Sequence, residues 1–480
     1  MIPKEEFAEK LNEIFDFGYN YRNENGINEE IREQFLTEFR INIVDRIDIL
    51  YKAAKYMIIE EDYVEPEWKE MISKHYIHSA YARSLKQRVL RIHFLCDNEF
   101  VEENYLGFIT LRPIRELAIA LSFIYVNWKH SFFDNSTSYV MTYKKDVHYF
   151  GKKLTIETYP FFAQDTIVTC CADANVVMLT KYYSNKYRSA FTGKSVPAFI
   201  KTSNKHQLPK KVNAALLQGI LTEVGISFRA KRFQAVRDYD EKQWDRIQKY
   251  IDVYIESAIP VVLGIDGHVV QLIGHIEFQD DMEKRYIVYD DSGYLENICL
   301  KENEQATRKF TYLLSVNEIR QYYEKKKLGE DRFFILMPEH ERVYIDFERY
   351  QIYLLLRIQQ YASVDLAEES IYSKIFNKDG NLKEEVVFRN MLVDNSFLKR
   401  FLAQQRSKGQ DEYIENLLRK ELPHFLWYTE IELNGDRMCI CADPTMYYET
   451  RNIEDLFLGE KPIGILGEKC LSLLTRGGSN

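Results

Sequence analysis

Residues 164–178 read Gln-Asp-Thr-Ile-Val-Thr-Cys-Cys-Ala-Asp-Ala-Asn-Val-Val-Met, and this stretch decides the fold. Cys170 and Cys171 lead into a nearly apolar segment, so residues 172–183 are expected to form a helix that is buried on several sides. A thiol at a helix N-terminus lies beside partial positive charge, which favours the nucleophilic thiolate. Gln164, six or seven residues ahead, can donate a hydrogen bond to the oxyanion that forms when a thiolate attacks a carbonyl.

Two downstream stretches supply the other groups that a thiol hydrolase needs. Residues 267–274, Gly-His-Val-Val-Gln-Leu-Ile-Gly, place His268 at the start of a β-like run. Residues 286–293, Tyr-Ile-Val-Tyr-Asp-Asp-Ser-Gly, place Asp290 and Asp291 at the end of another. A lone histidine on a strand is more simply a structural residue. Cysteine, histidine and aspartate in this order, however, are the parts of a cysteine-protease triad, and the combination favours catalysis.

Composition and charge exclude several other classes of protein. The chain has 480 residues, is 46% hydrophobic and carries a net charge of -9, which argues against a nucleic-acid partner. Its seven cysteines are few, odd in number and scattered, so a reducing compartment is favoured over a disulfide framework. Cys439 and Cys441 lie on a strand-like run without further metal-ligand spacing, and we expect them to pack in a core.

The sequence also predicts a cytoplasmic protein without a membrane partner. Residues 1–6 lack the apolar core of a signal peptide. The longest apolar stretch, residues 117–128, is shorter than the roughly 20 residues that a bilayer-spanning helix needs.

Three regions are expected along the chain, with boundaries near residues 100 and 338. Residues 1–100 show helical spacing of apolar residues, and Pro66 stands where a first-turn proline would begin a helix. Residues 101–338 begin with short alternating runs and continue into a core, and residues 339–480 combine helices with a β-hairpin. Because helices precede strands joined by hairpins, the fold class is α+β rather than doubly wound. In the core we expect helices at residues 212–224 and 244–257 and strands at residues 261–265, 269–278, 285–289 and 333–337.

The segment that begins at Cys171, Cys-Ala-Asp-Ala-Asn-Val-Val-Met-Leu-Thr-Lys-Tyr-Tyr, resembles a helix of papain-like bacterial cysteine peptidases. The similarity is to the branch related to bacteriocin-leader-processing (double-glycine) peptidases, whose usual form is Cys-Gly-Pro-Ala-Ala-Leu-Ala-Met followed by an aromatic pair. In this register the resemblance implies that Cys171 is the nucleophile and Gln164 the oxyanion-hole residue. It also implies that His268 is the general base and that Asp290 is the acid that orients it.

The resemblance covers about residues 155–295 and implies a papain-like core within residues 101–338. In such a core a central helix carries the cysteine and packs against an antiparallel sheet that carries the histidine and the acid. A peptide or protein substrate is implied, and no metal or organic cofactor is required.

Two departures from the family pattern leave alternatives open. Ala172 and Asp173 replace the usual Gly-Pro, and Asp173 could compete electrostatically with the thiolate. Asp291 replaces the proline that usually follows the acid, so the choice between Asp290 and Asp291 is open. The alternatives are a catalytically degenerate module that binds peptides or proteins, and a deamidase or transglutaminase that uses the same triad.

Overall fold

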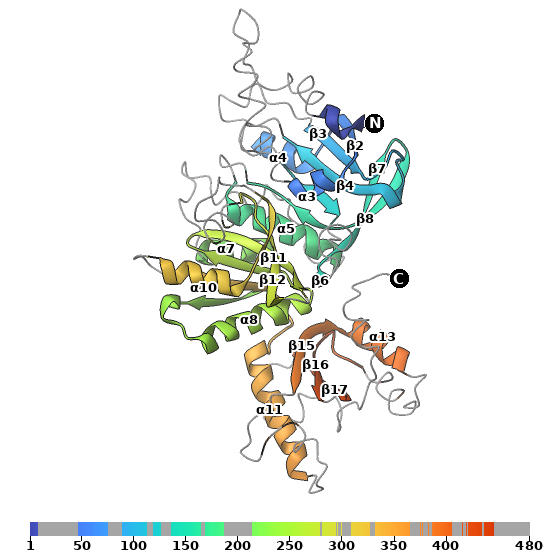
Figure 1. Ribbon diagram of the computed structural model, residues 1–480. Coiled ribbons are helices and arrows are strands. Elements are labelled where there is room, and N and C mark those ends of the chain that lie inside the picture. The colour runs from blue at the N-terminus through green and yellow to red at the C-terminus, as the bar shows by residue number, and fades with distance from the viewer. Residues whose placement is uncertain are drawn as a thin grey trace, which may run out of the picture. The chain divides into compact units, whose positions relative to one another are not determined.

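The chain forms an α+β structure with antiparallel sheets, divided into two compact units (Figure 1). One unit comprises Met1–Trp244 and Pro260–Pro338, and the other comprises Asp245–Ile259 and Glu339–Asn480. The computed structural model describes residues 1–7, 47–74, 89–112, 119–125, 136–164, 169–186, 214–278, 281–293, 295, 299, 309–326, 332–364, 375, 377, 383, 386–405, 415, 419, 421–433 and 436–445.

The first unit contains two sheets, of which one lies early in the sequence. Its seven strands follow the order β1-β2-β3-β4-β5-β8-β7, and neighbouring strands are antiparallel. The strands are β1 (Ile2–Pro3), β2 (Tyr56–Tyr63), β3 (Val89–Leu95), β4 (Tyr105–Leu111), β5 (Ser122–Tyr125), β7 (Tyr143–Tyr149) and β8 (Lys152–Phe161). The helices among them are η1 (Lys4–Glu6), α3 (Asp48–Ala53), α4 (Pro66–Lys74) and η5 (Glu102–Asn104).

The second sheet contains the strand that begins at His268 and the strand that ends directly before Asp290. Its strands follow the antiparallel order β13-β12-β11-β10-β14-β9, and β6 also pairs with β11. The strands are β6 (Ser136–Val140), β9 (Phe228–Phe233), β10 (Val261–Ile265), β11 (His268–Phe278), β12 (Asp281–Tyr289), β13 (Thr311–Leu314) and β14 (Phe333–Pro338). The helices are α5 (Cys171–Lys186), α7 (Ala214–Val224), η8 (Val236–Asp238) and α10 (Val316–Lys325). α8 (Glu241–Glu256) begins in this unit, and the rest of it from Asp245 onwards belongs to the other unit.

Most elements predicted for the core are confirmed, whereas the prediction that residues 1–100 are helical is wrong for two described segments. α4 begins at Pro66 as expected, but β2 and β3 are strands. β3 lies between β2 and β4 and is buried along nearly its whole length, although Arg91 and His93 interrupt its apolar residues. Pairing with partner strands, which local periodicity does not reveal, makes β2 and β3 strands. Residues 8–46 and 75–88 lie outside the described residues.

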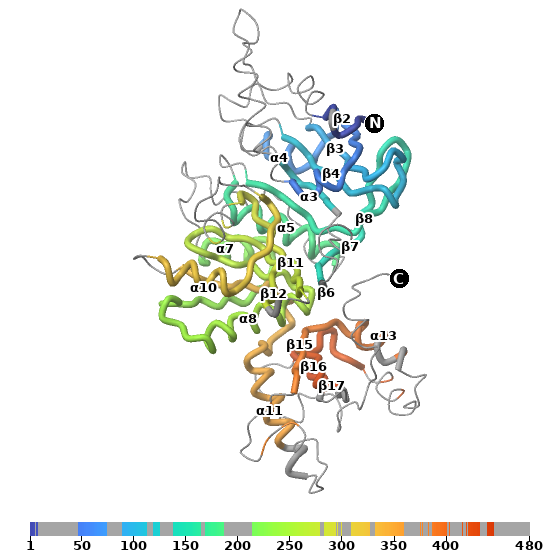
Figure 2. Tube along the Cα trace, viewed as in Figure 1, coloured from blue at the N-terminus to red at the C-terminus, as the bar shows by residue number. Residues whose placement is uncertain are grey.

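α5 and β11 pack against each other, and the first residues of these two elements are Cys171 and His268. α5 also packs against β8 and α7 (Figure 2). Most of its side chains are buried, as the sequence predicted. A two-residue turn joins β10 to β11, and both central residues, Asp266 and Gly267, have positive φ angles of 52° and 91°. This is the Asp-Gly hairpin turn whose twist matches that of the flanking strands. The turn makes His268 the first residue of β11.

The Asp266 side chain anchors this turn to α10. Its carboxylate forms an ion pair with Lys326 at 2.5 Å and accepts a hydrogen bond from the Tyr322 hydroxyl. The turn before His268 is therefore fixed both by its backbone conformation and by the contacts of the Asp266 side chain.

The second unit contains its own small sheet. Strands β15 (Val387–Asp394), β16 (Phe425–Leu433) and β17 (Asp436–Ala442) are antiparallel in that order, accompanied by α11 (Phe347–Val364), α13 (Asn395–Gln405) and most of α8. Tyr350 of α11 stacks on Trp427 with ring centroids 5.2 Å apart. Cys439 and Cys441 are buried on β17, as the packing interpretation predicted. No helix among the described residues combines the length and the apolarity that a bilayer crossing requires.

Gly274 of β11 allows β6 to approach closely, and this makes a first prediction. A Cβ atom at this position would lie 2.2 Å from the backbone oxygen of Tyr139, so Gly274→Ala should destabilise the protein by about 2 kcal/mol or more. Gly219 of α7 is the matched control, because a Cβ there would meet no atom within 4 Å. Gly219→Ala should stabilise by about 0.5–1 kcal/mol. Urea unfolding of both variants measures the difference, and equal midpoints would contradict the described pairing of β6 with β11.

Candidate active site

Cys171 occupies the first turn of α5, with Cys170 at the preceding capping position. The Cys170 carbonyl accepts the first intrahelical hydrogen bond, from Ala174 N at 3.1 Å. The Cys170 backbone N–H in turn donates to Asp173 Oδ2 at 2.9 Å. A carboxylate at this helix position that reaches back to the capping N–H is half of a capping box. Asp173, which the sequence suggested as a competitor of the thiolate, therefore has a structural role at the start of the helix.

The two adjacent cysteines differ in their surroundings. Burial and the nearby Asp173 carboxylate raise the pKa of the Cys170 thiol, which favours the neutral, unreactive form. The Cys171 sulfur instead lies beside His268 and contributes to the electrostatics of its ring. This difference supports Cys171 over Cys170 as the reactive thiol, a choice that rested on sequence register alone.

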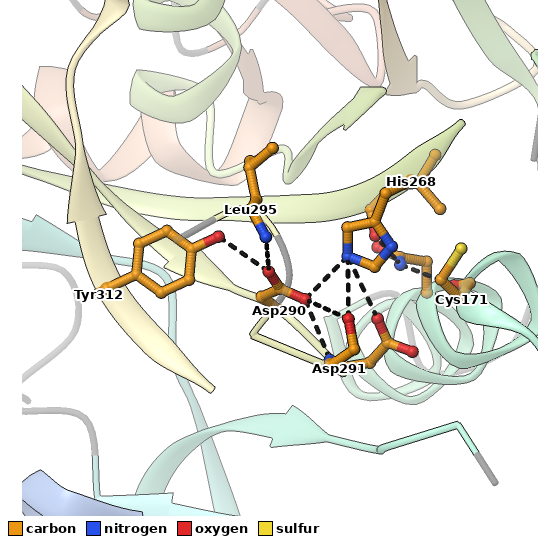
Figure 3. A network of polar contacts seen from close by, with 9 residues as sticks. Cys171, His268, Asp290, Asp291, Leu295 and Tyr312 are labelled. Carbon is orange, nitrogen blue, oxygen red and sulfur yellow. Dashed lines mark hydrogen bonds and ion pairs between the residues drawn. The ribbon is translucent and has the colours of Figure 1, made fainter. Parts of the chain in front are cut away.

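His268 is buried, with 8% of its surface exposed, and lies between an acid and the Cys171 end of α5 (Figure 3). Its Nε2 donates to Asp290 Oδ1 at 2.8 Å. Burial alone would lower the pKa of this imidazole, but the Asp290 carboxylate and then the Cys171 sulfur raise it well above its ordinary value. The ring therefore favours the imidazolium form next to the Cys171 sulfur.

Asp290 accepts hydrogen bonds from other groups besides the imidazole. Its Oδ1 accepts from Ser292 N at 3.0 Å, and its Oδ2 accepts from Leu295 N and from the Tyr312 hydroxyl, both at 2.9 Å (Figure 3). Burial alone would raise the pKa of Asp290, but the charge and hydrogen bond of His268 and the backbone N–H donors of Leu295 and Ser292 lower it to about 2. The carboxylate is thus ionised and fixed in position.

Asp291 is also buried and lies near the same imidazole. Its Oδ1 is 3.7 Å from His268 Nε2, against 2.8 Å for Asp290 Oδ1. The shorter distance and the more extensive hydrogen bonding favour Asp290 as the acid that orients the ring. The sequence alone could not make this choice.

These acids and the histidine also resemble a ligand set for a metal ion. His268, Asp290 and Asp291 each present a ligand atom, and these atoms lie within 4.8 Å of one another. Both Asp290 oxygens, however, already accept N–H or O–H hydrogen bonds. This donor set suits a carboxylate that orients an imidazole better than one that binds a cation.

Gln164 follows β8 by three residues and is half-buried. Residues 165–168, which connect it towards Cys170, lie outside the described residues. The structure thus brings Cys171, His268 and Asp290 together, whereas the oxyanion role of Gln164 stays a prediction. Sequence reasoning missed the Tyr312 and Ser292 hydrogen bonds to the acid, because Tyr312 lies in no motif and Ser292 is marked only as part of the stretch that carries the acids.

The comparisons with known proteins yield little similarity. No family model matches the chain, and no curated protein matches it. Among solved structures, the crystal structure of UfSP from C. elegans is similar over 38% of this chain and 33% of that chain, with 15% sequence identity and a TM-score of 0.24. The chain thus matches about a third of that structure, and a similarity of this extent supports neither a fold family nor a function.

The pKa of Asp290 predicts how stability depends on pH. Its carboxyl has a pKa lowered from 3.8 to about 2, so its contribution to stability is complete above pH 3.8 and is lost as the pH falls towards 2. Asp290→Asn should lower the stability at neutral pH and should also remove this acid-dependent loss.

Urea unfolding between neutral pH and about pH 2 measures this loss of stability. Asp48→Asn is the control, because it removes a surface ion pair with Lys52 and should change stability by less than about 1 kcal/mol. An Asp290→Asn protein with the acid dependence of the wild type would contradict the assignment.

Proposed function

We propose that the chain is a cysteine hydrolase that cleaves peptide bonds, with Cys171 as nucleophile, His268 as general acid and base, and Asp290 as the group that orients the imidazole. One observation carries the proposal. A buried imidazole, held by an ionised carboxylate at 2.8 Å, lies beside a cysteine at a helix N-terminus. This combination of a thiol, a base and an orienting third group is the arrangement that activates thiol nucleophiles.

The reaction follows from the positions of these groups. The Cys171 thiolate forms a bond to the carbonyl carbon, and the carbonyl oxygen takes the electron pair. As the tetrahedral intermediate collapses, the C–N bond breaks and His268 donates its proton to the leaving amine. Water then loses a proton to His268 and attacks the thioester, so that the acid product leaves and the Cys171 thiolate is restored.

The oxyanion of the tetrahedral intermediate needs hydrogen-bond donors to stabilise it. The Cys171 backbone N–H lies in the first turn of α5, where it has no partner four residues earlier within the helix. We propose that it acts together with the side-chain amide of Gln164. Removal of one such donor typically slows catalysis about 100-fold to 1,000-fold, so Gln164→Ala should reduce kcat by that factor.

The proposal predicts that Cys171 reacts in mild acid. At about pH 6, where less than about 1% of an ordinary thiol is ionised, iodoacetamide should alkylate Cys171 ahead of the other cysteines, as measured by peptide mass mapping. Cys170 is the internal control, because the two thiols are similarly buried, at 7% and 5% exposed, and burial raises the pKa of Cys170.

Cys171→Ala should abolish the labelling in mild acid. In the wild-type protein, EDTA should not change the rate at which Cys171 is labelled. Labelling that persists in the Cys171→Ala protein would remove the nucleophile assignment. A dependence on an added divalent cation would favour the metal-ligand interpretation of the two acids and the histidine.

Two further functions fit the same fold, and binding and product measurements distinguish them from peptide hydrolysis. A binding module without catalysis is favoured if peptide affinity survives in Cys171→Ala while no peptide library is turned over. Deamidation would add about one dalton to a protein side chain, and transglutamination would produce cross-links. Mass spectrometry of a treated proteome distinguishes these outcomes from the new peptide termini that hydrolysis would create.

A further inference from the structure

A buried side-chain amide connects the two chain segments that carry the proposed nucleophile and base. Asn175 lies one helical turn after Cys171 in α5 and is fully buried. Its Nδ2 donates to the Cys171 carbonyl at 2.8 Å and to the Val269 carbonyl at 3.0 Å. Val269 directly follows His268 in β11. One NH₂ group therefore uses both of its hydrogens to link the backbone of Cys171 to the backbone beside His268.

A second amide holds the first one in place. Gln271 of β11 is also fully buried, and its Nε2 donates to the backbone carbonyl of Asn175 at 2.7 Å. Gln271 Oε1 accepts from the hydroxyl of Tyr159 at 2.6 Å. Tyr159 belongs to β8, the strand that ends three residues before Gln164. The chain of hydrogen bonds thus joins the three segments that lead to the proposed nucleophile, base and oxyanion residue.

The orientation of the Asn175 amide is fixed by its partners. Two carbonyl oxygens face the same atom, and only a nitrogen donor can satisfy both of them. Among the described residues the other end of this amide, Oδ1, has no hydrogen-bond partner. A buried polar atom without a partner is costly, so the two hydrogen bonds donated by Nδ2 are what this amide supplies.

We propose that Asn175 is a positioning residue that sets the spacing between Cys171 and His268, supported by Gln271 and Tyr159. This inference rests on the proposed function, because the spacing matters only if the thiol and the imidazole share a proton. Without the amide, the Cys171 and Val269 carbonyls lose their common donor, and α5 and β11 are free to separate locally. A longer distance weakens the electrostatic coupling between thiol and ring, so more of Cys171 should carry its proton at a given pH.

The test is the pH profile of Cys171 alkylation by iodoacetamide in the full chain. Asn175→Leu keeps the approximate size but removes the donor, and it should move the profile towards alkaline pH by about one unit, which is about a tenfold slower reaction in mild acid. Thr180→Val is the matched control. It removes another buried side-chain hydrogen bond of α5, from Thr180 Oγ1 to Val176 O at 2.7 Å, which does not reach β11. Its profile should match that of the wild type.

A milder variant decides the question if Asn175→Leu does not fold. Tyr159→Phe removes only the hydroxyl that orients Gln271, and it should shift the profile in the same direction by a smaller amount. Folded variants with an unchanged profile would overturn the positioning role while leaving the proposed function intact. A wild-type protein whose Cys171 reacts only at alkaline pH, as an ordinary thiol does, would instead overturn the proposed function itself.

Discussion

The hydrogen bond between the buried imidazole of His268 and the carboxylate of Asp290 is the interaction on which the chemistry of this fold depends. A charged ring at 8% exposure is expensive to maintain without an opposite charge, and Asp290 supplies that charge at 2.8 Å. Asp290 is in turn kept ionised by the ring and by donors from Ser292, Leu295 and Tyr312. The proton on the ring therefore remains available beside Cys171.

The surrounding fold keeps these groups at the ends of rigid elements. The hairpin turn before β11 fixes His268, the end of β12 delivers Asp290, and the capped first turn of α5 holds Cys171. Each functional side chain thus lies at the first residue of, or directly after, a helix or strand. Such positions combine a precise location with access to the space beyond the element.

The sequence predicted the core well because its signals were local. The β-like run that begins at His268, the apolar segment after Cys171 and the acids that follow β12 each mark an element end within a few residues. It failed for β2 and β3, whose strand conformation comes from pairing within a sheet rather than from a local apolar pattern.

Long-range contacts explain what else the sequence could not supply. Asp290 and Asp291 are adjacent in sequence, and only the distances to one imidazole nitrogen separate them. The link from Asn175 to Val269 crosses 94 residues, so no local pattern reveals it. A signal was nevertheless present, since Gln271 is a polar residue in the middle of the apolar run Val-Val-Gln-Leu-Ile.

The protonation state of the His268 ring is the most direct measure of the central claim. Ring-nitrogen NMR of the full chain, recorded across a pH titration for the wild type and for Cys171→Ala, reports it without any substrate. We expect both ring nitrogens of the wild type to carry protons at neutral pH, with a midpoint well above 6.5 that falls when the sulfur is removed. A neutral His268 ring that titrates near 6.5 in both proteins would contradict the account.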